Sequence, residues 1–216
     1  MASLLNIIID PGKVFTHIKE KDDWWIPFIL IVIIAFIVSW ISSPVIARLT
    51  AQRLAEMGID REMPGGLGLI RYIMIPVGTL ISWFVISVIF WMISNSFGGN
   101  WNFIKALDLY AYSSVVGVIK SILTIIVLKI RGLQNIASFR DLSIDSGLTL
   151  FFKPESTRMY TLVSGIDIFQ IWIYVLLAFG ISELAGISRK KAAIVSIITF
   201  IITLAFKVLL TREGSY

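Results

Sequence analysis

The sequence predicts an all-α integral membrane protein, a bundle of five transmembrane helices with an amphipathic interfacial helix at its N-terminus. Hydrophobic residues make up 57% of its 216 residues and charged residues only 15%, whereas a soluble domain is about 45–50% apolar and about 25% charged. The apolar residues also gather in five runs, each near the length of about 20 residues that a helix needs to cross a bilayer. So little charge cannot cover a soluble surface, which excludes most classes of soluble enzyme.

Residues 1–24 are expected to form a membrane-surface segment rather than a span. After Pro11, the apolar residues Val14, Phe15 and Ile18 follow helical spacing, and lysines occupy the other face. This pattern predicts a short amphipathic helix that lies in the membrane interface. It would serve as a plain anchor or as a regulatory arm.

A five-span membrane domain is predicted over residues 25–210. Charged or turn-forming residues bound each apolar run. Pro44 and Pro76 should kink or end the first two helices, because proline lacks the N–H that a helix interior uses. The predicted spans are 25–47, 69–93, 104–128, 160–182 and 192–210, followed by a C-terminal tail over 211–216. An odd number of spans places the two termini on opposite sides of the membrane.

One connection, over residues 129–159, is long and polar. Unstructured loops of this length are uncommon in folded domains. We expect part of it to lie on the membrane surface or to fold back against the bundle.

Lys120 and Asp167 are charged residues inside the third and fourth predicted spans, where charge is costly. Counted at 1.5 Å per residue, they lie about 12 Å and about 10 Å below the same membrane face. We therefore predict an intramembrane ion pair between them. The pair could fix the register of the helices, or it could belong to a charge relay or to a polar cavity for an ion or a headgroup. Lys207, near the end of the fifth span, is expected to extend to the headgroups.

Other polar residues form a second set of candidates. Lys105 and Asp108 lie one turn apart at the start of the third span. They would form an exposed helix-end pair or part of a second polar site on the N-terminal face. Tyr112 and Tyr174 are further polar candidates within the spans.

Residues for catalysis or metal binding are scarce in this chain. It contains no cysteine, and His17 is its single histidine, so paired-histidine metal ligation and Ser-His-Asp chemistry within the membrane are excluded for one chain. No phosphate-binding glycine loop or HExxH motif is present. We therefore expect no catalytic residue, no metal site and no cofactor.

The order of several short motifs resembles the Yip-domain family, the Ypt/Rab-interacting type of five-span membrane protein. The pieces include Asp10-Pro11, the stretch Phe97-Gly98-Gly99, the stretch from Gly165 to Trp172, and the turn from Gly186 to Ala192. The family-motif residues are Gly98, Gly99, Phe169, Trp172, Gly186, Ser188 and Lys191. The resemblance covers nearly the whole chain.

This resemblance implies a location and an orientation. Only 24 residues precede Trp25, which matches the short prokaryotic form, so we expect a prokaryotic cell membrane and no Rab-type GTPase partner. The family implies a cytoplasmic N-terminus. The positive-inside rule points the other way, because eleven Lys and Arg residues lie on the side of 129–159 and seven on the N-terminal side.

Two functions remain open on the sequence. The first is a non-enzymatic scaffold that organises membrane partners or membrane shape. The alternative is a transporter, channel or lipid-moving protein that uses Lys120 and Asp167. The formal net charge of +5 suits anionic lipids better than nucleic acid. The expected partners are therefore the lipid bilayer with its anionic lipids, and a second copy of the chain or another membrane protein.

Overall fold

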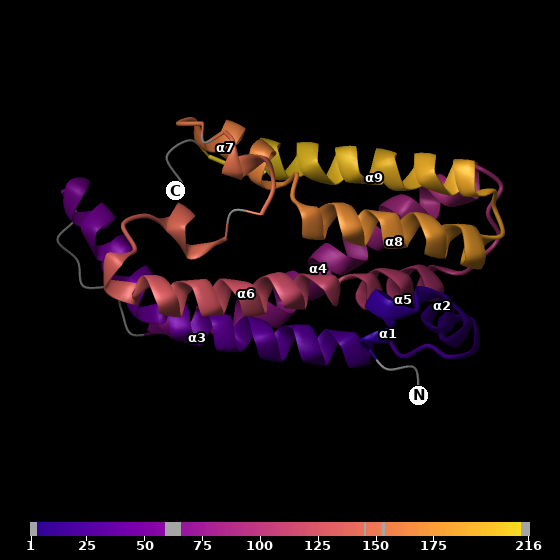
Figure 1. Ribbon diagram of the computed structural model, residues 1–216, viewed down its shortest axis with the longest axis horizontal. Coiled ribbons are helices and arrows are strands. Elements are labelled where there is room, and N and C mark those ends of the chain that lie inside the picture. Colours follow the sequence, from indigo (N-terminus) through magenta and orange to yellow (C-terminus); the bar gives the residue numbers. More distant parts are fainter. Residues whose placement is uncertain (1–3, 59–65, 145, 153, 213–216) are drawn as a thin grey trace.

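The computed structural model is an all-helical bundle, described for residues 4–58, 66–144, 146–152 and 154–212 (Figure 1). Within these ranges five helical stretches are long and apolar enough to cross a membrane, which confirms the predicted fold class. The helices are α1 (Asn6–Ile9), α2 (Pro11–Glu20), α3 (Trp25–Glu56), α4 (Gly66–Ser96), α5 (Phe103–Ser113), α6 (Val116–Arg131), α7 (Thr157–Ser164), α8 (Ile168–Ala185) and α9 (Arg189–Leu210). The described chain begins and ends at opposite ends of the bundle (Figure 1). Residues 213–216 of the expected tail lie outside the described residues.

The helices α3 and α4 are longer than the first two predicted spans, and the prolines do not end them. Pro44 lies inside α3 and Pro76 inside α4. Pro44 cannot donate to the carbonyl of Trp40, but the hydroxyl of Ser43 donates to that oxygen at 2.8 Å. A side-chain hydroxyl of this kind satisfies the freed backbone group and lets a membrane helix continue past proline.

The third predicted span is divided in two. α5 ends at Ser113, and α6 begins at Val116. At the junction the amides of Gly117 and Val118 donate to the carbonyls three residues earlier, at 2.9 Å each. These shorter bonds tighten the turn, so the span changes from one helix to the next without leaving the bundle.

The fourth span begins later than the predicted 160–182. Its first residues form the separate helix α7, and the transmembrane helix α8 starts only at Ile168. Asp167 has an extended backbone, and its side chain accepts hydrogen bonds from the amides of Phe169 and Gln170. A carboxylate in this position starts a new helix. Asp167 therefore lies at the start of a span rather than inside one, which corrects the prediction.

The N-terminal segment folds against the protein. Val14, Phe15 and Ile18 share one face of α2, as predicted, and all three are buried. α2 contacts α5 and α8. The apolar face that was expected to lie in lipid is therefore covered by the bundle.

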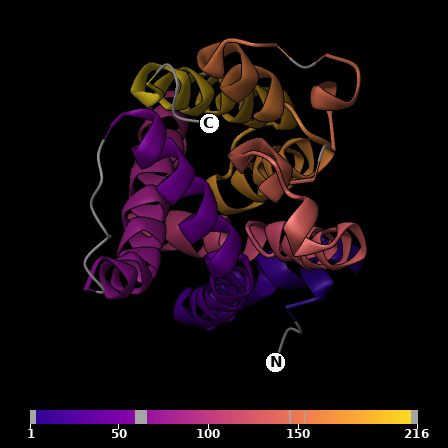
Figure 2. The ribbon, with the colours of Figure 1, turned by 90° about the vertical axis from the view of Figure 1, so that its left-hand side faces the viewer.

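The long connection also folds back against the bundle, which was one of its two expected arrangements (Figure 2). It is shorter than 129–159, because α6 continues to Arg131 and α7 begins at Thr157. Three short 3-10 turns form in it, η1 (Leu133–Asn135), η2 (Phe139–Leu142) and η3 (Leu148–Leu150). The amide of Leu148 donates to Ile166 at 3.3 Å, and the amide of Ile168 donates to Ser146 at 3.2 Å. These bonds attach the connection to the backbone just before α8.

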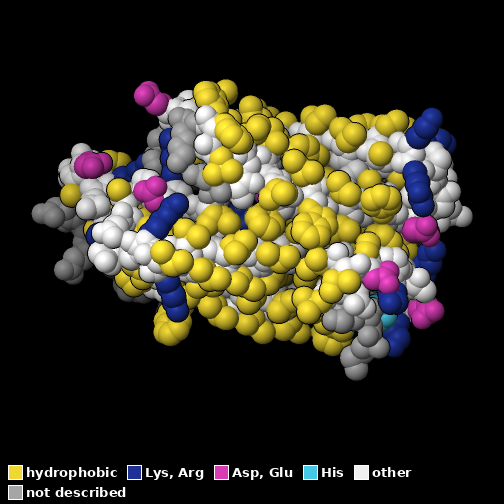
Figure 3. All heavy atoms as spheres, in the orientation of Figure 1, with side chains coloured by type: hydrophobic (Ala, Val, Ile, Leu, Met, Phe, Trp, Pro, Cys, Tyr) yellow, Lys and Arg dark blue, Asp and Glu magenta, His cyan; other side chains and the backbone are white. Residues whose placement is uncertain are grey.

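The core lies around α5 and α8, and the outer helix faces are apolar. Residues 106–113 of α5 are all buried. By contrast, α3 exposes a stripe of apolar side chains at helical spacing, Ile29, Ile33, Ile37 and Trp40. Figure 3 shows the same division on one face, where hydrophobic side chains cover the middle and most charged side chains gather at the two ends. This is the distribution expected of a membrane-spanning bundle.

Candidate functional site

Lys120 and Asp167 meet between α6 and the start of α8. The Lys120 Nζ lies 2.7 Å from the Asp167 Oδ2, and the side chains are 27% and 9% exposed. The other carboxylate oxygen, Oδ1, accepts from the amide of Phe169 at 2.8 Å and of Gln170 at 3.0 Å. The structure thus brings the predicted pair together and gives Asp167 a second task, the capping of α8.

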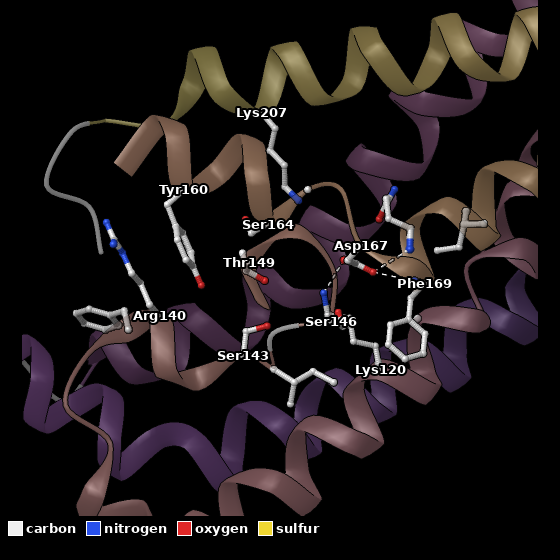
Figure 4. Close-up of a pocket in the computed structure, with 16 residues that line it drawn as sticks. Lys120, Arg140, Ser143, Ser146, Thr149, Tyr160, Ser164, Asp167, Phe169 and Lys207 are labelled. Atoms are coloured by element: carbon white, nitrogen blue, oxygen red, sulfur yellow. Dashed lines mark hydrogen bonds and ion pairs between the residues drawn. The ribbon is translucent and has the colours of Figure 1, made fainter. Parts of the chain in front are cut away.

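The pair lies in a cavity of about 250 Å³. Its walls come from α6, α7, α8, α9 and the folded-back connection, and Figure 4 shows how the side chains converge. The lining residues are Gly117, Lys120, Phe139, Arg140, Ser143, Ile144, Ser146, Thr149, Tyr160, Ser164, Gly165, Asp167, Phe169, Gln170, Ile173 and Lys207. The cavity combines charged groups, several hydroxyls and an apolar wall.

The described lining of this cavity carries three cations and one carboxylate. Arg140 is held by the carbonyls of Pro154, at 3.0 Å, and Glu155, at 2.7 Å. Its guanidinium carbon also lies 4.5 Å from the ring centroid of Tyr160. Such contacts fix the guanidinium in place without neutralising it. The cavity therefore has an excess of positive charge among its described residues.

Lys207 is the cation that the sequence did not assign to this site. Its side chain extends from α9 into the cavity, toward Asp167 (Figure 4). Among the described residues, no carboxylate lies within 4.0 Å of its amino group. The expectation that Lys207 extends away to the headgroups is thus replaced by a position at the cavity. A lysine near a span end carries no sequence signal that separates these two orientations.

A second polar cluster joins the N-terminal segment to α5. Asp23 accepts a 2.8 Å hydrogen bond from the Tyr112 hydroxyl, and its other oxygen lies 2.7 Å from the His17 Nε2. The amide of Asp23 donates to the Asp108 Oδ1 at 3.0 Å. Asp108 is fully buried. These contacts fasten the N-terminal segment where it enters α3.

Lys105 belongs to the same end of the molecule but does not pair with Asp108. Its amino group lies 2.9 Å from the Asp22 Oδ1 and also donates to the carbonyls of Ile18 and Lys21. The helix-end pair is therefore wrong, and the second polar site on the N-terminal face is the arrangement that forms. His17, Asp22 and Asp23 were missed as partners, because the sequence does not indicate that their segment folds over α5.

Tyr174 joins neither charged cluster. Its hydroxyl lies 2.7 Å from the Thr203 Oγ1. It faces a separate apolar groove between α8 and α9, together with Ile171 and Phe200. The residues of this groove carry no charge. Tyr174 therefore has a structural role, because its hydrogen bond to Thr203 links α8 to α9.

Most of the family-motif residues meet at the N-terminal end of the bundle, where two turns touch. The Lys191 amino group donates to the carbonyl of Phe97 at 2.9 Å. Gly99 packs so closely that an added Cβ would lie 2.8 Å from the Ser94 carbonyl oxygen. Gly186 has a φ of +70°, a conformation that favours glycine, and Ser188 caps α9 by accepting from the Lys191 amide at 3.4 Å. These residues have a structural task in shaping the turns.

Gly98, Phe169 and Trp172 complete the motif set. Gly98 has a φ of +92° in the turn after α4. Phe169 lines the cavity beside Asp167, and Trp172 packs partly buried against the core. The motif residues around Asp167 therefore line the cavity, whereas the motif glycines shape the turns at the opposite end of the bundle.

The described part of the chain contains no set of side chains arranged to bind a metal ion. There, no group of three or more His, Cys, Asp or Glu side chains is arranged to hold a metal ion.

Comparison with known proteins gives two matches. The model of the Yip1 domain matches residues 5–210. The chain is 24% identical over 215 residues to membrane protein YknW from Bacillus subtilis (strain 168), a match that covers 94% of this chain and 87% of YknW. No solved structure matches.

Proposed function

The chain belongs to the Yip1 domain family, and from this membership we propose that it is a non-enzymatic multi-pass membrane protein that organises membrane partners or membrane shape. The observation that carries this proposal is the separation of its two charged clusters by packed core. Asp108 and Lys120 are twelve residues apart in the sequence, or about 18 Å along a helix. Between them, Leu109, Tyr110, Val115 and Val116 are buried.

This packed layer argues against a polar path through the bundle. A transport path needs polar groups or water along its whole length. Buried apolar side chains of α5 and α6 follow the cluster around Asp23 instead, and the buried Ile173 forms part of the cavity lining. The arrangement of both clusters therefore supports a scaffold function better than a transport function.

The outer surface supports a role in lateral association. The stripe on α3 exposes Ile33 by 50%, Ile37 by 40% and Trp40 by 72%. In a membrane such a face meets lipid or another apolar helix. A second copy of the chain or another membrane protein is the partner class that we propose.

A second candidate function, lipid movement or transport, is favoured by one specific observation. The cavity around Lys120 and Asp167 holds an additional cation, Lys207, with no carboxylate within 4.0 Å among the described residues. An ionisable cavity at membrane depth is a typical feature of transport proteins.

Reconstitution separates the two functions. The full-length chain in liposomes is expected to give no ion flux and no lipid scrambling above empty vesicles. In cells, a photo-crosslinking residue in place of Ile33 should give discrete protein adducts, and one in place of the buried Leu177 should give none. Flux or scrambling that disappears in Asp167→Asn would establish the second candidate instead.

We also propose a prokaryotic cell membrane with a cytoplasmic N-terminus. The proposal is supported by the Bacillus relative and by the family resemblance. The chain has no cysteine, so single cysteines report topology directly. A cysteine at Phe151 should react with an impermeant maleimide in intact cells, and one at Lys190 should react only after lysis. The reverse pattern would invert the orientation.

A further inference from the structure

We propose that the cavity between α6, α8 and α9 is a binding site for a phosphate group, which a phospholipid headgroup presents from the bilayer. The site takes one anionic group beside Lys207 and Lys120, whose side chains point toward Asp167, and Arg140 adds positive charge on the far side of the cavity (Figure 4). It stands independently of the scaffold function, because it rests on the chemistry of the cavity alone.

The charge balance favours an anion. Asp167 is the one carboxylate among the described lining residues, and it already accepts from Lys120, Phe169 and Gln170. Its charge is therefore compensated within the protein. Lys207 and Arg140 have no carboxylate within 4.0 Å among the described residues, so an incoming anion would complete the charge balance. Lysine and arginine are the side chains that bind phosphate oxygens most often.

Hydroxyl groups add donors to the same space. The Ser146 Oγ belongs to a residue that lines the cavity, is closed to solvent and has no hydrogen-bond partner among the described residues. Burying a hydroxyl without a partner is unfavourable, and a phosphate oxygen would accept a hydrogen bond from it. Ser143 lies on the same wall. The cavity thus offers a phosphate neutral donors as well as cations.

The dimensions and surroundings point to a lipid as the source of the phosphate. The volume of about 250 Å³ exceeds that of several water molecules, at about 30 Å³ each. Lys207 is exposed, and its neighbours on α9 include the exposed Phe206 and Leu210. Figure 3 shows basic atoms at a depression in the apolar middle of the molecule. A basic group framed by apolar side chains matches a molecule with an anionic head and hydrocarbon tails.

The test measures phosphatidylglycerol binding to the purified full-length chain in detergent by native mass spectrometry. Lys207→Gln should weaken binding by about fivefold, the effect of one cation near a headgroup, and Lys207→Arg should retain it. Lys190→Gln is the matched control, because it removes the same charge from the other end of α9 and should leave binding unchanged. Since Lys207 makes no ion pair with the residues that the structure describes, Lys207→Gln should fold normally, which circular dichroism checks.

Two further ligands identify the source of the phosphate. Phosphatidylcholine carries the same phosphate next to a choline cation, so it should bind more weakly than phosphatidylglycerol and lose less affinity in Lys207→Gln. Millimolar inorganic phosphate could raise the melting temperature of the wild type but not of Lys207→Gln, while phosphatidylglycerol binds both proteins equally. That result would mean that the site takes free phosphate. Equal behaviour of wild type, Lys207→Gln and Lys190→Gln toward both phosphatidylglycerol and inorganic phosphate would overturn the proposal.

Discussion

The carboxylate of Asp167 binds the amino group of Lys120 with one oxygen, at 2.7 Å, and caps α8 with the other. Helix capping and charge pairing are thus combined in one side chain at the point where the chain enters the fourth span. The two contributions can be separated by substitution, because asparagine keeps the capping oxygen but loses the charge.

Asp167→Ala should therefore destabilise the protein more than Asp167→Asn. The expected difference is about 1 kcal/mol, the usual contribution of a capping side chain. Thermal melting of both variants in the same detergent measures it. Equal melting temperatures would mean that the cap contributes nothing.

Lys120→Met should destabilise the protein, because it leaves the Asp167 carboxylate buried without its cation. We expect a loss of about 2 kcal/mol, less than the about 3–5 kcal/mol of a fully buried pair, since Lys120 keeps 27% of its side chain exposed. The double variant Lys120→Met with Asp167→Asn should regain part of this loss. Chemical unfolding of the single and double variants gives the coupling, and a double variant as unstable as the sum of the singles would refute it.

Tyr112→Phe should loosen the N-terminal segment without unfolding the bundle. It removes the hydrogen bond to the buried Asp23, which is expected to cost about 1 kcal/mol or somewhat more for a charged acceptor. Hydrogen exchange should rise in α2 and remain unchanged in α9. Tyr72→Phe is the control, since Tyr72 stacks on Phe36 through its ring, and unchanged exchange in α2 of Tyr112→Phe would contradict the prediction.

Gly147→Ala should push the connection off the cavity. A Cβ at Gly147 would collide with the Ile166 carbonyl oxygen and with the backbone of Asp167. We expect a loss of about 1–3 kcal/mol, as for other overpacked positions. Gly117 lines the same cavity but has open space at its Cβ, so Gly117→Ala should be neutral or slightly stabilising. Limited proteolysis between α6 and α7 distinguishes the two variants, and equal resistance would be the contrary outcome.

The membrane fold and the principal charged pair could be predicted from the sequence for simple physical reasons. Five apolar runs are long enough to span a bilayer, and similar depths below one face bring Lys120 and Asp167 close to the same level. The start of α8 was misplaced because Asp167 was counted as a residue within a hydrophobic run. Hydropathy averages over such a run and does not detect that a carboxylate within it can cap the start of a new helix.

The polar cluster around Asp23 could be predicted only in part. Lys105, Asp108 and Tyr112 were visible as polar residues on one span, but their partners lie about 85 residues earlier in the chain. An amphipathic helix has the same sequence pattern whether its apolar face is covered by lipid or by protein. The docking of α2 on α5 and α8 is therefore decided by tertiary packing, and no pattern within the α2 sequence predicts it. Lys207 was misassigned because a lysine near a span end has the same sequence pattern whether its side chain extends to the headgroups or into a cavity.

The docking of α2 also constrains the order in which the protein can assemble during synthesis. The segment leaves the ribosome first, but the Asp108 that holds it and the α8 that covers it follow much later in the chain. At about 5–20 residues per second, synthesis takes about ten seconds or longer to proceed from α2 to the end of α8. Until α5 is synthesised, the apolar face formed by Val14, Phe15 and Ile18 lacks both helices that it contacts in the folded protein, and it lacks α8 until the end of that interval. The bilayer interface or a chaperone would have to cover it, so the N-terminal segment needs a temporary partner during synthesis that the folded protein replaces with its own helices.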